Sequence, residues 1–341
     1  MFVELKERMV LQWHITHACN LRCRHCYQEE YQSDMPKEQL LDILEKYTEF
    51  INKHDYMGQI NLTGGEPLLH PYFFELSKEI KKRGIRLGIL TNGTLIDQKC
   101  ARKLKALNPL FVQVSVDGIR KTHDKIRGDG AYKKTMKAIR YLKKNKIRVL
   151  VSFTAQKNNY QEFEKIARVC KWHRVDKLWW DRVVTESEEE KNALALTTEE
   201  FHWLVKKSGE LSDKYRNNKG IGMITNQRAL QFLGCEDQVW GYQCSAGKTL
   251  LAVLADGTVM PCRRLPFVVG NILESDFDEI LNSHEVLREL RKFLYPKECK
   301  SCKHLIRCKG GARCVTYGQT GNLYAKDVNC KENEKVTGIR P

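Results

Sequence analysis

The chain has 341 residues, a length that suggests one large domain or two ordinary ones. Hydrophobic residues make up 42% of it and charged residues 29%, and this composition excludes a disordered, collagen-like or membrane-embedded protein. Lysine and arginine number 58 against 42 aspartates and glutamates, which gives a formal net charge of +16. Such a surplus of positive charge attracts anionic partners, so the partner could be nucleic acid, an acidic peptide or a carboxylate-rich small molecule. The alternative is a lysine-rich surface that is only solvated.

Cysteine usage and the N-terminus narrow the class of protein. The thirteen cysteines are an odd number, which excludes complete internal disulfide pairing. Charged residues stand where a secretion signal would place its apolar stretch, and no apolar run approaches the roughly 20 residues that span a bilayer. Clustered cysteines without such a signal favour metal binding or redox chemistry. The sequence therefore predicts a soluble, cytoplasmic protein that holds metal.

Short apolar runs alternate with amphipathic stretches over the first half of the chain. The runs predict strands at 11–16, 59–63, 86–91, 111–116, 148–154 and 177–184. The stretches between them predict helices at 36–52, 71–83, 97–107, 131–144 and 160–172. This alternation implies right-handed crossovers and a parallel sheet. Six units are too few for an eight-stranded barrel, so we expect an α/β fold with a partial, open (β/α)6 TIM-like barrel and chemistry at the C-terminal ends of its strands.

The character of the chain changes after Thr185. A charge-rich break at 186–190 is followed by a predicted helix at 197–215. Beyond residue 230 the chain becomes rich in cysteines and turns, and Asp256-Gly257 predicts a hairpin between 250–254 and 258–260. A helical pair is expected at 276–282 and 284–294. We therefore divide the chain into a partial barrel (1–190), a helical linker region (191–240) and a smaller domain built around metal (241–341).

The first cysteine cluster follows the first predicted strand. Cys19, Cys23 and Cys26 supply three thiolates, which can hold three irons of a four-iron cluster and leave the fourth iron open to a ligand. A zinc site completed by His25 or His17 is the alternative on spacing alone.

The motif Gly64-Gly65-Glu66-Pro67 stands at the end of the second predicted strand. Glycines let backbone approach a ligand closely, and proline fixes the strand exit. Together, the spacing CxxxCxxC and this GGEP motif resemble the radical S-adenosylmethionine (SAM) superfamily, and this resemblance favours iron over zinc. The resemblance implies that SAM chelates the open iron, that Glu66 and neighbouring backbone accept from its amino group, and that one-electron reduction yields methionine and a 5′-deoxyadenosyl radical.

Other polar residues match segments that line the SAM pocket in relatives. The resemblance implicates Asn92, Ser115 and Asp117 at strand ends, Arg127 beyond them, and Ser152 on the fifth strand. Arg127 is a candidate bidentate partner for the SAM carboxylate, and Asp117 for a ribose hydroxyl. The alternative for Asn92 and Asp117 is an ordinary role in a turn or helix cap.

The second cysteine cluster comprises Cys244, Cys262, Cys299, Cys302, Cys308 and Cys330. Its spacing resembles the SPASM domain, the auxiliary iron–sulfur module of many radical SAM enzymes. By this resemblance, one auxiliary cluster takes Cys299, Cys302, Cys308 and Cys330 as ligands. The other would use Cys244, Cys262, an upstream cysteine and a cysteine four residues after Cys308. A zinc-ribbon-like staple is the alternative for the Cys299–Cys302 pair.

The sequence departs from the SPASM pattern at Ala312, where the family has a cysteine. We expect Cys314, two residues further on, to complete the first auxiliary cluster; a three-coordinate cluster or one of altered nuclearity remains open. Cys235 is a candidate upstream ligand, hydrogen-atom donor or merely structural residue.

SPASM modules accompany enzymes that act on large substrates, so the resemblance favours a peptide-modifying enzyme. The product would be a crosslinked, epimerised or oxidised residue of a ribosomally made peptide. Because the first strand begins near residue 11, we expect no separate leader-binding domain, and the positive surplus would help to hold an acidic precursor. An electron donor such as flavodoxin or ferredoxin is implied. A haem-pathway enzyme that trims tetrapyrrole side chains is the alternative, and an RNA-modifying enzyme is a third reading, without a recognised RNA-binding module.

Overall fold

A ten-stranded sheet organises the molecule in the computed structural model, which describes residues 6–27, 34–185, 187–216, 223–225, 228–234, 242–292 and 295–331. Its strand order is β10-β9-β8-β1-β2-β3-β4-β5-β6-β7. The strands are β1 (Arg8–His14), β2 (Met57–Thr63), β3 (Arg86–Thr91), β4 (Phe111–Ser115), β5 (Val149–Ala155), β6 (Lys177–Arg182), β7 (Met223–Thr225), β8 (Leu250–Val253), β9 (Thr258–Met260) and β10 (Gly270–Asn271). From β1 to β7 each strand pairs in parallel with the next along the chain.

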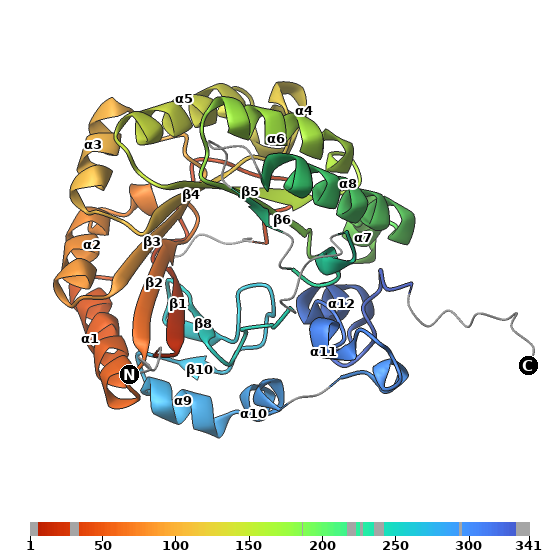
Figure 1. Cartoon of the computed structure of the whole chain (residues 1–341). Coiled ribbons are helices and arrows are strands. Elements are labelled where there is room, and N and C mark those ends of the chain that lie inside the picture. Colours follow the sequence, from red (N-terminus) through yellow and green to blue (C-terminus); the bar gives the residue numbers. More distant parts are fainter. Residues whose placement is uncertain are drawn as a thin grey trace, which may run out of the picture.

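Helices follow the strands and cover one face of the sheet (Figure 1). They are α1 (Lys37–Lys53), α2 (Phe73–Lys82), α3 (Gln98–Ala106), α4 (Arg120–Arg127), α5 (Ala131–Lys144), α6 (Phe163–Trp172), α7 (Glu188–Leu194), α8 (Thr198–Arg216), α9 (Phe277–Ser283), α10 (Glu285–Arg291), α11 (Leu305–Cys308) and α12 (Arg313–Thr320). Short 3-10 turns lie at Pro67–Leu69, Tyr160–Glu162, Gln231–Gly234 and Lys297–Cys299. The partial barrel expected from the sequence is confirmed, since the sheet ends at β7 and β10 without closing.

Alternation along the strands separates a helix-facing side from an inner face. Trp180 is fully buried and its ring packs against Phe163 of α6 and Phe201 of α8. Its neighbour Trp179 points the other way, is only partly buried, and donates from its indole nitrogen to Gln113 on β4 at 3.1 Å. Because successive side chains of a strand point to opposite faces, the inner face carries polar, partly exposed residues on strands that are central in the sheet.

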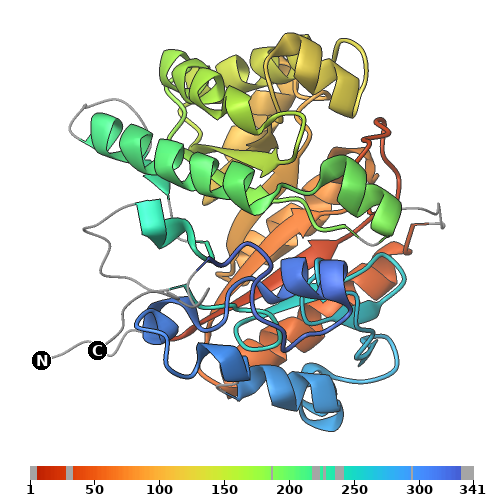
Figure 2. The same cartoon turned by 90° about the vertical axis from the view of Figure 1, so that its right-hand side faces the viewer.

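The C-terminal part of the chain returns to the barrel. β8 pairs in parallel with β1, with Val10 opposite Leu250, and β8 and β9 form the expected antiparallel hairpin around Gly257, whose φ is 85°. In Figure 1 the segment that carries α11 and α12 stands across the open side of the sheet, and Figure 2 shows it in front of the strands, below α8. The division at residues 190 and 240 stays a prediction; the sheet itself crosses both boundaries, through β7 and β8.

Several segments differ from the expectation. In the region expected to be a helical linker, β7 adds a seventh parallel strand beside β6. The charge-rich stretch read as a break includes the N-terminal cap and the first turn of α7, because the Ser187 hydroxyl caps this helix by accepting from the Glu190 amide at 3.2 Å. Three glutamates in the first turn also favour that end of a helix. The segment from Arg120 to Arg127, read only as a ligand-lining motif, forms α4. Within the described residues no helix is long and apolar enough to cross a membrane.

Candidate active site

The GGEP turn after β2 is joined to the cysteine loop after β1. The Gly65 amide donates to the Thr16 carbonyl and the Glu66 amide to the Ala18 carbonyl, both at 2.8 Å. Gly64 has φ 145°, and a Cβ at Gly65 would overlap the Ala18 carbonyl oxygen. The glycine pair therefore permits contact between two backbones, and this contact fixes where the cysteine loop begins.

Cys19, Cys23 and Cys26 lie in this loop as free thiols that interact electrostatically with one another. Arg127 Nη1 lies 3.8 Å from Cys23 Sγ. Asn92 Nδ2 lies 3.9 Å from Cys19 Sγ. Burial raises the pKa of the Cys23 thiol to about 11, although the Arg127 charge opposes this. The described residues hold no preassembled group of three metal-ligating side chains. The three thiols nevertheless share one loop beside a cation, and thiols of this kind bind an iron–sulfur cluster as thiolates.

Glu66 is fully buried, and its carboxylate holds the end of β3. One oxygen accepts from the Thr91 hydroxyl at 2.7 Å and from the Leu68 amide at 3.3 Å, and the other from the Asn92 amide at 2.8 Å. Burial raises the pKa of Glu66 to about 7, against the effect of these hydrogen bonds. The expected acceptor for the SAM amino group thus already has protein donors on both oxygens. Among the described residues, however, none donates to the Gly64 or Gly65 carbonyl.

Asp117 and Arg127, expected to contact different parts of SAM, contact each other. Arg127 Nε donates to Asp117 Oδ2 at 2.6 Å, and both side chains are buried. The other Asp117 oxygen accepts from the Thr154 amide at 2.8 Å. Burial would raise the pKa of Asp117, but Arg127 and His25 hold it below its ordinary value. Among the described residues, Arg127 forms its side-chain contacts through Nε and Nη1, and none accepts a hydrogen bond from Nη2.

Ser115 and Ser152 are neighbours on the inner face. They stand opposite each other in the register of β4 and β5, and both are partly buried. Trp179 is the register partner of Ser152 on the next strand. The structure thus places the two serines in one row with an aromatic ring. Pro67, the last residue of the GGEP motif, is buried at the start of a 3-10 turn.

The auxiliary cysteines form two groups in the described part of the chain. Cys299, Cys302, Cys308 and Cys330 line one pocket, together with apolar side chains of Phe232 and Leu305. Cys244, Cys262 and Cys314 pack around a separate apolar cluster that includes Ala246 and Leu265. The fold therefore brings Cys314 to the other two, where the family pattern would place a cysteine at Ala312. Cys235 lies outside the described residues.

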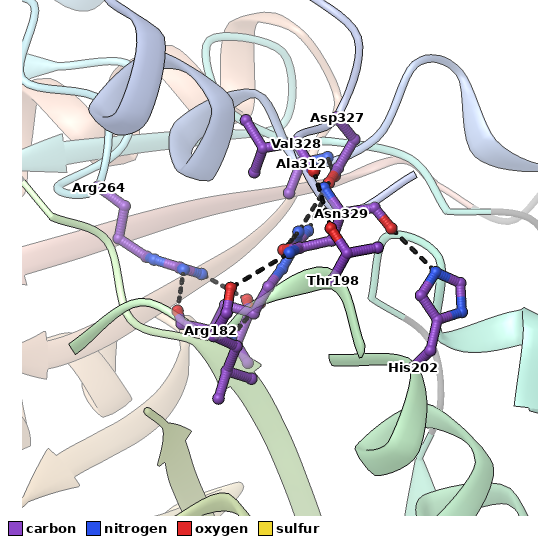
Figure 3. Close-up of polar contacts among 10 residues, drawn as sticks. Arg182, Thr198, His202, Arg264, Ala312, Asp327, Val328 and Asn329 are labelled. Carbon is purple, nitrogen blue, oxygen red and sulfur yellow. Dashed lines mark hydrogen bonds and ion pairs between the residues drawn. The ribbon is translucent and has the colours of Figure 1, made fainter. Parts of the chain in front are cut away.

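Sequence reasoning missed a buried network at the end of β6 (Figure 3). Arg182 donates from Nη1 and Nη2 to the two oxygens of Asp327, at 2.7 and 2.8 Å, and from Nη1 to Asn329 Oδ1 at 2.6 Å. Asp327 also accepts from the Ala312 amide at 2.7 Å. The Arg182 carbonyl in turn accepts from Arg264 at 2.7 Å. No motif signals these residues, because the charges come from segments about 145 residues apart.

The network connects β6 to three cysteine-bearing segments. Arg264 stands two residues after Cys262, Ala312 two before Cys314, and Asp327 three before Cys330. In addition, His202 on α8 contacts the Asn329 carbonyl through Nε2, at 2.9 Å. Through these contacts, Arg182 connects the barrel to segments that carry candidate ligands of both auxiliary clusters.

A second contact joins the two cysteine regions. Arg263, which follows Cys262, donates to the carbonyl of Tyr27 at 2.7 Å, and its guanidinium lies 4.3 Å from the centroid of the Tyr27 ring. Tyr27 directly follows Cys26. The auxiliary set that includes Cys262 therefore stands beside the loop of the first set.

A partial parallel barrel with a cysteine loop after β1 and a Gly-Gly-Glu turn after β2 is the arrangement expected of an iron–sulfur enzyme that uses SAM, and comparison with known families agrees. Residues 13–170 match the model described as "Radical SAM superfamily", and residues 244–303 match SPASM, described as "Iron-sulfur cluster-binding domain". The chain belongs to the radical SAM superfamily and carries a SPASM domain. It is accordingly an enzyme that uses SAM, a radical SAM cluster and auxiliary iron–sulfur clusters.

Relatives of two kinds of described activity are among the matches. The AdoMet-dependent heme synthase of Methanosarcina barkeri is 30% identical, over 94% of this chain and 95% of its own. The mycofactocin maturase MftC of Mycolicibacterium smegmatis is 27% identical, over 94% of this chain and 82% of its own. Among solved structures, anSMEcpe with bound AdoMet and the Cp18Cys peptide has a TM-score of 0.79 at 23% identity, covering 94% of this chain and 93% of that one. Streptococcus suis SuiB bound to S-adenosylmethionine has a TM-score of 0.77 at 16% identity, covering 96% and 78%.

Proposed function

We propose that this enzyme abstracts a hydrogen atom from a ribosomally made peptide and so crosslinks, epimerises or oxidises it. The observation that carries the proposal is the contact of Arg263 with Tyr27, which sets an auxiliary cysteine group beside the first cysteine loop. An auxiliary cluster held by that cysteine group would supply an acceptor for the electron of a substrate radical. Similarity to the mycofactocin maturase supports a peptide as substrate.

Residues at the C-terminal ends of the strands bind the cluster and different parts of SAM. Cys19, Cys23 and Cys26 hold the radical SAM cluster, which with SAM supplies the 5′-deoxyadenosyl radical. The carbonyls of Gly64 and Gly65 accept from the SAM ammonium group, while Glu66 keeps the turn in place with Pro67.

The remaining polar residues orient SAM. Arg127 donates from Nη2 to the SAM carboxylate while its Nε remains hydrogen-bonded to Asp117. The main role of Asp117 in SAM binding is therefore to orient this arginine. Asn92 lies between Glu66 and Cys19. Ser115 and Ser152, on the inner face of the sheet, supply hydroxyl groups that can hydrogen-bond to SAM.

The auxiliary ligands follow the two groups seen in the fold. Cys299, Cys302, Cys308 and Cys330 hold one cluster. Cys244, Cys262 and Cys314 hold the other, and Cys235 is the candidate for its fourth ligand or for a hydrogen-atom donor.

A tetrapyrrole is the second candidate substrate. Two relatives from Methanosarcina barkeri, the heme synthase and the Fe-coproporphyrin III synthase, are 30% identical and span 94% and 97% of this chain. On the inner face, Arg228 lies over the Trp179 ring at 4.8 Å, an arrangement of cation and aromatic plane that suits a flat, carboxylate-bearing ring.

A paired assay decides between these substrates. Reconstituted enzyme with SAM and reductant is given a precursor peptide encoded beside its gene, or iron coproporphyrin. We expect 5′-deoxyadenosine to rise with the peptide and the peptide to lose two hydrogen atoms, or to take up solvent deuterium at Cα. An unchanged peptide, together with consumption of the porphyrin, would replace the proposal by the tetrapyrrole reading.

A further inference from the structure

A basic cleft borders the first cysteine loop on the side of α4. Its lining includes Arg24, from the loop itself, and Arg120, Lys121 and Lys125 of α4. All four cations are exposed, and none forms an ion pair with another described residue. The two carboxylates of the lining are Asp124 and Asp129, and Asp124 is engaged, because it accepts from the Tyr132 amide at 2.7 Å.

Residues that line the cleft are in direct contact with the loop that carries the candidate cluster ligands. Arg24 lies between Cys23 and Cys26 in sequence, and its amide donates to the Ile126 carbonyl of α4 at 2.9 Å. One residue later, Arg127 reaches Cys23 Sγ. A protein seated on the cleft would therefore rest on the loop and helix that support these thiols.

The start of α4 is also fixed. Glu162 accepts from the Ile119 amide at 2.8 Å and from the Thr122 hydroxyl at 3.0 Å. The cations of α4 are thus presented on an anchored element, as a docking surface requires for a defined encounter.

We propose that this cleft docks an acidic one-electron carrier protein, of the flavodoxin or ferredoxin class, which reduces the radical SAM cluster. The inference rests on the proposed assignment of Cys19, Cys23 and Cys26 to that cluster. In each encounter the carrier loses one electron and the cluster gains it, and no bond forms or breaks at the cleft. Electron-transfer encounters bury little surface and depend on complementary charge, which four unpaired cations supply.

Charge reversal on α4 provides the test. The cleft variant carries Arg120→Glu, Lys121→Glu and Lys125→Glu. The control carries Lys99→Glu, Arg102→Glu and Lys105→Glu on α3, three cations that are also exposed and lie outside the cleft. Both variants change the net charge equally, so long-range repulsion is matched. Formation of 5′-deoxyadenosine is measured with reduced flavodoxin at low salt, and separately with excess dithionite.

We expect the flavodoxin-driven rate to fall about tenfold or more in the cleft variant and by less than about threefold in the control, with dithionite-driven rates unchanged. Raising the salt concentration should slow the parent enzyme and abolish its advantage over the cleft variant. Equal losses in both variants, or none in the cleft variant, would overturn the proposal. Loss of precursor-peptide binding with unchanged flavodoxin kinetics would assign the cleft to the peptide instead.

Two controls keep the outcome interpretable. If the triple reversal lowers iron content, the neutral variant with Arg120→Gln, Lys121→Gln and Lys125→Gln replaces it, with a smaller loss expected. If the parent enzyme fails to cleave SAM with dithionite, the cluster assignment fails, which is distinct from failure of the docking site.

Discussion

Arg182 and Asp327 form a buried, two-armed ion pair between the end of β6 and the segment that precedes Cys330, with exposed fractions of only 4% and 2%. Burial by itself opposes both charges, but Arg182 lowers the pKa of Asp327 below its ordinary value. Such pairs are costly to break from one side, because the remaining charge stays buried. The stability of the contact between the barrel and the cysteine-rich segment therefore depends on this pair.

Arg182→Met should destabilise the holoenzyme by about 3–5 kcal/mol, since it leaves Asp327 buried and unpaired. Thermal unfolding and the iron content of the purified protein measure the effect, and loss of auxiliary iron should accompany the lower midpoint. Arg168→Met is the control, because Arg168 pairs with Glu164 on the surface of α6 and should change neither quantity measurably. Equal behaviour of the two variants would contradict this role for Arg182.

Cys19→Ala, Cys23→Ala and Cys26→Ala should each abolish SAM cleavage, because a cluster with two remaining ligands does not retain its open iron in place. The readout is 5′-deoxyadenosine formed with dithionite. Cys100→Ala, on the half-buried face of α3, should retain activity close to that of the parent. Persistent cleavage in the triple variant would overturn the assignment of the cluster to this loop.

The four cysteines that share one pocket should hold a separate cluster. With Cys19, Cys23 and Cys26 all changed to alanine, we expect substantial iron and sulfide to remain. Substitution of Cys299, Cys302, Cys308 or Cys330 should remove about four irons and destabilise the surrounding segment, since metal binding there is coupled to folding. A folded triple variant without iron would contradict an auxiliary cluster.

Cys314→Ala tests how the chain compensates for Ala312. We expect loss of iron and an altered spectrum of the first auxiliary cluster, with SAM cleavage intact, because Cys314 packs with Cys244 and Cys262 and lies apart from the cysteine loop. An unchanged iron count would instead indicate an open or differently ligated cluster.

Cys235→Ala then separates two chemical outcomes. Loss of a cluster would make Cys235 a ligand. Retention of all clusters, with loss of solvent deuterium incorporation at the peptide Cα, would make it a hydrogen-atom donor and the enzyme an epimerase.

Gly65→Ala should disturb the cysteine loop, since its Cβ would overlap the Ala18 carbonyl oxygen. We expect incomplete occupancy of the first cluster and at least a tenfold loss of SAM cleavage. Gly84→Ala is the control: Gly84 has φ 72° but open space around its Cβ position, so it bears only backbone strain of about 1 kcal/mol. Equal, mild effects of both substitutions would show that the close approach at Gly65 is unimportant.

Local patterns in the sequence determined the six parallel strands, the hairpin at Asp256-Gly257 and the two cysteine motifs. Periodicity and turn chemistry act over a few residues, so they can be read without the fold. The same reasoning misread the stretch that begins α7, because its helix depends on a cap at Ser187 and acidic residues in the first turn, features that resemble a solvated break.

Only the tertiary structure decided the partners of the charged and cysteine side chains. It paired Arg127 with Asp117, directed the Glu66 carboxylate to the end of β3, gathered Cys314 with Cys244 and Cys262, and connected Arg182 to Asp327. Except for the Arg127–Asp117 pair, which is ten residues apart, these contacts join segments far apart in the chain. For the charged groups among them, burial in a low-dielectric interior favours pairing because an unpaired charge there is costly. The spacing of residues in the sequence does not predict such contacts. It does predict a ligand set whose residues all lie in one loop, such as the first three cysteines.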